Sequence, residues 1–167
     1  MKIGNGKLKI GIWGLYGQNE KKISIQELEK LAADTLKIYP LDNIFCAIFF
    51  QKIKNTFISN FLLNKNEIKN ERNLDILSII GRNIKPRYSL KERVVYSTPE
   101  PGIFAHELCH TIGLEHISSE CGKKEKCLDL IDARVCQFSK YIMGCAGTFD
   151  KTGNFSYTEL KKLGEMF

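Results

Sequence analysis

The pattern of apolar and polar positions predicts mostly strands in the first hundred residues. Residues 7–17 (KLKIGIWGLYG) mix β-branched and aromatic side chains and end in glycine, which is typical of a strand. Later segments share this composition, and we predict further strands at residues 43–50, 74–81 and 92–98. The strand at 43–50 does not alternate, so we expect it to be buried on both faces. Residues 51 to about 73 fit either a strand or a helix and are left unassigned.

A helix is predicted to follow the first strand. Ser24 is its N-cap, Glu27 completes a capping box, and Ile23 can pack on Leu28. Apolar positions then repeat every three or four residues, and they predict a buried face made of Leu28, Leu31, Ala32, Thr35, Leu36 and Tyr39. Pro40 ends the helix.

The second half of the chain contains two further predicted helices. Pro99 and Pro101 precede an apolar-periodic helix that carries HELCHTIGLEH, residues 106–116. Ser156 and Glu159 form another capping box, which predicts a C-terminal helix from about residue 157. The order of strands and helices predicts a mixed α/β domain.

Length and charge narrow the class of protein. With 167 residues, 43% of them hydrophobic, the chain is expected to fold as a single domain with its own core. The formal charge is +6, but the basic residues are spread along the sequence. Because no basic stripe interleaved with aromatic residues is present, we do not expect nucleic-acid binding.

Cysteine usage points to an oxidising compartment. Four of the six cysteines, Cys121, Cys127, Cys136 and Cys145, crowd into one loop-like segment, which favours a disulfide-stapled loop. A structural zinc site is the alternative, although C-x-x-C pairs are missing. No signal peptide or membrane span of about 20 apolar residues is visible. We therefore expect a secreted, extracellular protein, present here as a mature or trimmed piece of a longer chain.

All three histidines of the chain fall within residues 106–116. His106 and His110 are spaced i, i+4 and so lie on one face of a helix, where both can bind one zinc ion. Gly113 allows the helix to end in a left-handed residue, and the chain can then bring His116 round as a third ligand. The open fourth position would hold a water molecule, and Glu107 lies where a general base is needed to take its proton. The alternative is an ordinary amphipathic helix that happens to contain histidines.

These residues resemble the metzincin zinc endopeptidases. Residues 106–116 match H-E-x-x-H-x-x-G-x-x-H, and Met143 in YIMG corresponds to their Met-turn. Within metzincins the chain is most similar to the adamalysin (reprolysin, ADAM-type) branch, because the cysteine-bearing RVCQFSKYIMG leads to the methionine and NFSYTELKKL follows it. It departs from that branch at Cys109, where glycine is usual, and at Ile117, where aspartate is usual.

The resemblance implies a fold and an activity. It implies a twisted mixed sheet over an active-site helix in residues 1–116, and a small C-terminal subdomain in 117–167 with Met143 beneath the ligands. The implied activity is zinc-dependent hydrolysis of peptide bonds. The protein or peptide substrate would bind in an extended conformation along an edge strand of the sheet. We expect residues 74–81 to be that edge and the protein to be a monomer.

Several alternatives stay open at this stage. Cys109 is interpreted as a packed thiol, with a role as an inhibitory metal ligand as the alternative. Residues 150–159 do not satisfy the pattern of an EF-hand, so calcium is not indicated there, although calcium elsewhere is not excluded. An inactive zinc-bearing binding module competes with the peptidase, and a structural zinc or disulfide domain without a cleft is a third reading. Neither alternative needs Glu107.

Overall fold

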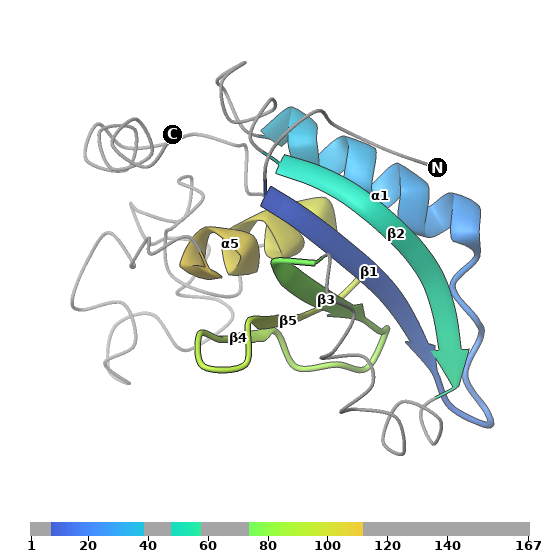
Figure 1. The fold of residues 1–167 in the computed structure, drawn as a ribbon. Coiled ribbons are helices and arrows are strands. Elements are labelled where there is room, and N and C mark those ends of the chain that lie inside the picture. The colour runs from blue at the N-terminus through green and yellow to red at the C-terminus, as the bar shows by residue number, and fades with distance from the viewer. Residues whose placement is uncertain (1–7, 39–47, 58–73, 112–167) are drawn as a thin grey trace, which may run out of the picture.

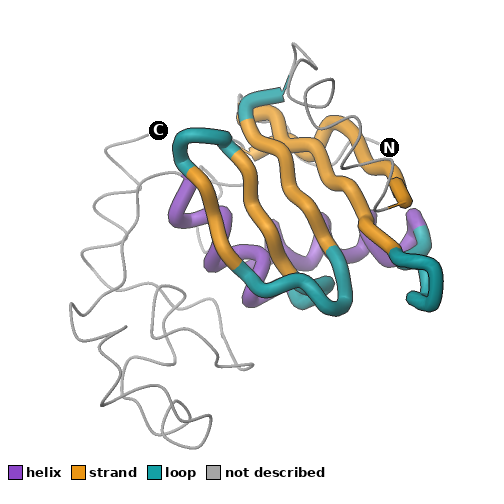
Figure 2. The backbone as a smooth tube through the Cα atoms, turned by 90° about the horizontal axis from the view of Figure 1, so that it is seen from below, coloured by secondary structure: helices purple, strands orange, loops and turns teal. Residues whose placement is uncertain are grey.

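The computed structural model describes residues 8–38, 48–57 and 74–111. In this part of the chain a five-stranded sheet carries two helices on one of its faces (Figures 1 and 2). The strands are β1 (Leu8–Tyr16), β2 (Ile48–Phe57), β3 (Ile76–Ile80), β4 (Arg87–Ser89) and β5 (Val94–Ser97), and the helices are α1 (Ile25–Ile38) and α5 (Pro101–Thr111). The fold is mixed α/β, as the sequence predicts.

The strand order of the sheet is β2-β1-β3-β5-β4. β1 pairs in parallel with β2 and β3, β3 pairs in parallel with β5, and only β4 runs antiparallel to its neighbour. β3 is therefore central, and the prediction that residues 74–81 form an edge is wrong. All five residues of β3 are buried, which is the property of a strand covered on both faces.

The boundaries of the strands differ from the prediction in two places. β2 begins within the predicted strand 43–50 but continues to Phe57, through residues that the pattern left unassigned; residues 43–47 lie outside the described part. β4 was not predicted, because its three residues are polar and partly exposed and follow Pro86 in an expected loop. β1, β3 and β5 lie at the predicted positions.

Both faces of the sheet are apolar. Side chains on the face toward the helices join α1 and α5 in one buried cluster, to which the strands contribute Ile10, Ile12, Ile48, Phe50, Ile76, Ile80 and Val95. A second cluster on the opposite face contains Trp13, Leu15, Leu77, Ile79 and Val94. Consecutive strand residues thus enter different clusters, which explains why apolar residues follow one another in β1, β3 and β5 instead of alternating with polar ones.

The predicted capping box of α1 is confirmed. The backbone N–H of Ser24 donates to Glu27 Oε2 at 2.7 Å, and the backbone N–H of Glu27 donates to Ser24 Oγ at 3.0 Å. The hydrogen bond from the Ser24 backbone is the main reason why the pKa of Glu27 lies below its usual value. Ile23 is buried, as are the predicted face residues apart from Tyr39, which lies outside the described part.

Replacing Ser24 by alanine should lower the free energy of unfolding by about 1 kcal/mol, because the N–H of Glu27 loses its acceptor. Denaturant unfolding followed by circular dichroism would measure the change. Ser24→Asp is the matched control, since its carboxylate can accept the same hydrogen bond and should keep stability close to wild type. Equal destabilisation by both variants would contradict a capping role.

Several predicted features lie outside the described residues. They are Gly113, His116, Met143, the cysteine-rich loop and the C-terminal helix, and with them the proposed lower subdomain at 117–167. Neither described helix is long and apolar enough to cross a bilayer.

Candidate metal centre

α5 starts directly after β5, as the two prolines predict. Pro101 is the first helical residue, a position that needs no N–H donor. The backbone N–H of Phe104 donates to the carbonyl of Glu100 at 2.9 Å, which begins the helical hydrogen bonds. Only residues 98–100 separate β5 from α5, so the sheet fixes where the helix begins.

The side of α5 that faces the core is apolar. Phe104, Ala105, Leu108 and Cys109 belong to the cluster between the helices and the sheet, and the Phe104 ring lies 5.9 Å from that of Phe50 on β2. At about 100° per residue, the centre of this side lies about 150° around the helix from the centre of the two histidines. His106 and His110 are therefore not part of the apolar core, although only 3% and 8% of their surfaces are exposed.

The two histidine side chains point at each other. Their Nε2 atoms lie 3.2 Å apart, and the ring planes are nearly perpendicular, at 88°. Two nitrogens that bind one tetrahedral zinc ion at 2.0–2.1 Å would be about 3.3 Å apart. The pair thus fits a single shared cation without a change of rotamer, and in neutral tautomers it can also share one hydrogen bond.

Glu107 lies between the two histidines in sequence and on the same helix. It is 7% exposed and is one of only three buried charged or titratable polar residues of α5, together with His106 and His110. A buried carboxylate is costly unless its surroundings stabilise the charge. Its position one residue after the first histidine is the one that the sequence assigned to a proton acceptor.

Tyr88 of β4 contacts one of the two histidines. Its ring stacks on the ring of His110, with 4.5 Å between the centroids and 17° between the planes. Tyr88 is 39% exposed, so it contacts His110 on one side and solvent on the other. Sequence reasoning missed this residue, because nothing in the sequence around Tyr88 indicates that a turn folds it against a distant helix.

Cys109 is packed, as the sequence indicates. It is fully buried and belongs to the same cluster as Phe104 and Leu108. This position supports the interpretation as a core residue over that as an inhibitory metal ligand.

The described part of α5 brings together three of the predicted site residues. His106, Glu107 and His110 are placed, whereas His116, Gly113 and Met143 lie beyond Thr111 and outside the described part. Within residues 8–38, 48–57 and 74–111, no group of three or more His, Cys, Asp or Glu side chains is gathered around one metal position.

No protein-family model and no curated protein sequence matches the chain. Among solved structures, the chain is similar to the crystal structure of metalloproteinase-II from Bacteroides fragilis, with a TM-score of 0.51 and 14% sequence identity. The match covers 98% of this chain and 54% of that one, so the chain spans about half the length of that protein. This likeness shows a common fold, a mixed α/β arrangement of a sheet and helices.

Proposed function

We propose that the protein is a zinc-dependent endopeptidase in which His106, His110 and His116 hold one zinc ion and Glu107 transfers protons. The observation that carries the proposal is the 3.2 Å separation of the His106 and His110 Nε2 atoms on the side of α5 turned away from the core. The metalloproteinase-like fold supports it. Glu107, buried on the same helix, supports it as well.

The proposed roles of the side chains follow from their chemistry. A zinc ion at this position supplies a Lewis acid that polarises a peptide carbonyl and makes a water molecule more acidic. Glu107 takes the proton of the attacking water and passes it to the leaving amine. Tyr88 holds the plane of the His110 ring by stacking on it, so that the imidazole is oriented before a metal binds.

We propose β4 as the strand along which substrate lies. Among the described strands, β2 and β4 are the edges of the sheet, and β4 is the one whose side chain touches a proposed ligand. An extended peptide can add to such an edge through main-chain hydrogen bonds. This assignment replaces residues 74–81, which are central.

The finer assignments from the sequence remain part of the proposal. We place the protein among the metzincins on the motif at 106–116 and on Met143, and near their adamalysin branch on RVCQFSKYIMG and NFSYTELKKL. We propose disulfides in the 121–145 segment and an extracellular location on the cysteine pattern. We also propose that the enzyme acts as a monomer.

Metal analysis and a digestion assay test the proposal together. Purified protein should contain one zinc ion per chain and should cleave a denatured protein such as reduced casein. Incubation with 1,10-phenanthroline should lower the cleavage rate to at most about a tenth of its starting value. Addition of equimolar zinc after removal of the chelator should restore it.

The outcomes separate the competing functions. Protein that binds zinc but cleaves nothing would identify an inactive zinc-bearing binding module. Protein that binds no stoichiometric metal and cleaves nothing would exclude both assignments. Cleavage that survives the chelator would point to a peptidase of a different class.

A further inference from the structure

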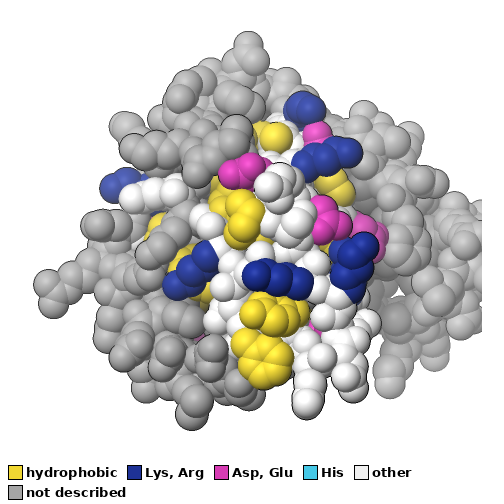
Figure 3. Space-filling model, turned by 90° about the vertical axis from the view of Figure 1, so that its right-hand side faces the viewer, with side chains coloured by type: hydrophobic (Ala, Val, Ile, Leu, Met, Phe, Trp, Pro, Cys, Tyr) yellow, Lys and Arg dark blue, Asp and Glu magenta, His cyan; other side chains and the backbone are white. Residues whose placement is uncertain are grey.

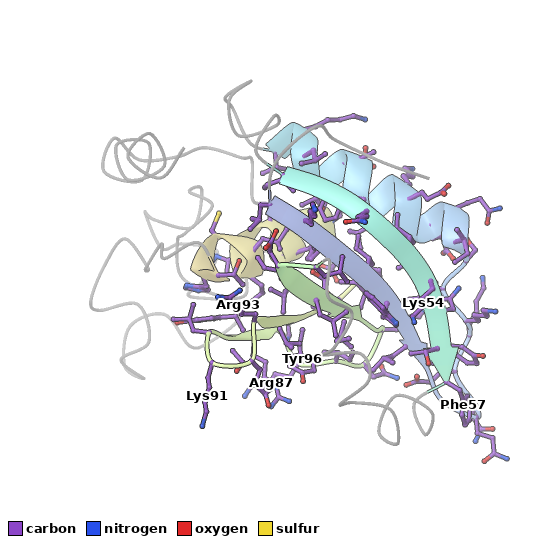
Figure 4. The ribbon with its side chains drawn as sticks, in the orientation of Figure 1. Lys54, Phe57, Arg87, Lys91, Arg93 and Tyr96 are labelled. Atoms are coloured by element: carbon purple, nitrogen blue, oxygen red, sulfur yellow. The ribbon has the colours of Figure 1, made fainter. Side chains whose placement is uncertain are left out.

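The hairpin made of β4 and β5 carries a concentrated positive charge. Between residues 85 and 93 the sequence KPRYSLKER has four basic side chains, Lys85, Arg87, Lys91 and Arg93, and one acidic side chain, Glu92. The stretch therefore has a formal charge of +3, half of the +6 of the whole chain. The four basic residues are exposed, and Figure 4 shows Arg87, Lys91 and Arg93 along this one hairpin.

Two basic side chains elsewhere in the described part have acidic partners. Arg82 lies 3.1 Å from Glu27, and Lys37 lies 2.9 Å from Asp34. Figure 3 shows the face at the carboxyl ends of β1 and β2, where basic and acidic side chains lie together around hydrophobic ones. Among the described residues, in contrast, no ion pair involves Arg87, Lys91 or Arg93. The hairpin is thus available to an acidic partner.

Arg87 is held in a defined place on β4. It pairs with Tyr96 of β5, and its guanidinium carbon lies 4.5 Å from the centroid of the Tyr96 ring. A cation over an aromatic face is attracted by the ring and keeps its outer N–H groups for other partners. The turn beyond it is also fixed, because the N–H of Arg93 donates to the carbonyl of Leu90 and the N–H of Glu92 to Ser89 Oγ, both at 3.3 Å.

The two faces of β4 meet different partners. Successive strand residues point to opposite faces, so Arg87 lies on the face of Tyr96, whereas Tyr88 lies on the face of α5 and stacks on His110. A peptide paired with β4 must alternate in the same way. Peptide side chains that face the histidines therefore alternate with peptide side chains that face Arg87. In a cross-strand pair, the Cβ atom of the peptide residue opposite Arg87 would lie about 5 Å from the Arg87 Cβ atom.

We propose that the enzyme selects acidic polypeptide segments, with Glu or Asp at the alternate positions that face Arg87. This inference rests on the proposed peptidase function and names its substrate class. Arg87 forms the ion pair directly, and Lys91 and Arg93 attract the segment over a longer range. Arg93 also lines a pocket of about 280 Å³ together with Asp75, Leu90 and Thr111, the residue after His110, so this basic side chain lies near the end of α5.

Matched peptides test the inference. The bonds that wild-type protein cleaves in a denatured protein are first identified by mass spectrometry. Peptides are then made around the bond that is cleaved fastest. For each position near this bond, one peptide carries Glu and a second, otherwise identical peptide carries Gln. We expect kcat/KM to rise about threefold with Glu at every second position and to be unchanged at the positions between, since an exposed ion pair contributes modestly. The gain should disappear in 1 M salt.

Three variants identify the partner of the acidic side chain. Arg87→Gln should remove the preference for Glu, Arg87→Lys should keep part of it, and Lys21→Gln should leave it intact, because Lys21 is exposed in the loop between β1 and α1. Binding of the same peptides to zinc-loaded Glu107→Ala protein, followed by fluorescence anisotropy, provides a readout that needs no turnover. Affinities should show the same alternation.

The outcomes distinguish a failure of the acidic selectivity from a failure of the proposed peptidase function. Cleavage without any alternation, or a preference for Glu that survives Arg87→Gln, would overturn the acidic selectivity and leave the peptidase assignment in place. Wild-type protein that cleaves no peptide at all would overturn both. An alternation that tracks Arg87 would support the substrate class.

Discussion

Replacing Glu107 by alanine should lower peptide cleavage by at least about a hundredfold while leaving the zinc content unchanged. General acid–base catalysis by a positioned side chain contributes about 10²–10⁴-fold, and Glu107 is the buried carboxylate beside the histidine pair. Alanine removes the carboxylate without touching either imidazole. The loss should appear in kcat, because the proton transfers occur during the reaction and not during substrate binding.

The measurement compares cleavage of one peptide by both proteins, with zinc determined by mass spectrometry on the same samples. Glu100→Ala is the matched control, since it removes a carboxylate just before the first turn of the same helix. We expect it to keep activity close to wild type. Retention of more than about a tenth of the activity by Glu107→Ala would contradict the assigned proton transfer.

Replacing His110 by alanine should weaken zinc binding by more than about a hundredfold. Loss of a residue that merely supports a ligand already weakens metal binding by about 10–100-fold, and His110 is proposed as a direct ligand. Its Nε2 lies 3.2 Å from that of His106, so its removal leaves one of the two described nitrogens. Competition with a chromophoric chelator would measure the affinity.

Tyr88→Phe is the control for this experiment. It keeps the ring that stacks on His110 and removes only the hydroxyl, so the zinc affinity should stay within about threefold of wild type. Equimolar zinc bound tightly by His110→Ala would show that this histidine is not a ligand. A melting curve for each variant separates loss of metal from loss of fold.

The features that could be predicted best from the sequence are those that depend on residues close together in the chain. The capping box at Ser24 and Glu27 needs only four residues to form, and it is present as predicted. The i, i+4 spacing of His106 and His110 was enough to predict that their nitrogens meet, because a helix fixes that geometry. The rest of the ligand set depends on residues beyond Thr111 and stays a prediction.

The arrangement of the strands could not be predicted in the same way. Which strand is central depends on pairing between residues far apart in the chain, and periodicity does not report it. The segment at 76–80, apolar except for Ser78, does indicate burial on both faces, so it could have argued against an edge position. β4 has no such signal, because Arg87, Tyr88 and Ser89 are held as a strand by contacts with residues distant in sequence, namely the pairing with β5 and the stacking of Tyr88 on His110.

The separation of the two sides of α5 has a consequence for the metal-free protein. Phe104 and Leu108 anchor the helix in the core, and the histidines project from the other side. Burial of these apolar side chains, and not metal binding, therefore holds this helix in position. Because the imidazoles are preorganised, metal binding should cost little conformational entropy. We therefore expect α5 to stay folded when the metal is removed, unlike a small zinc finger, which unfolds without its metal.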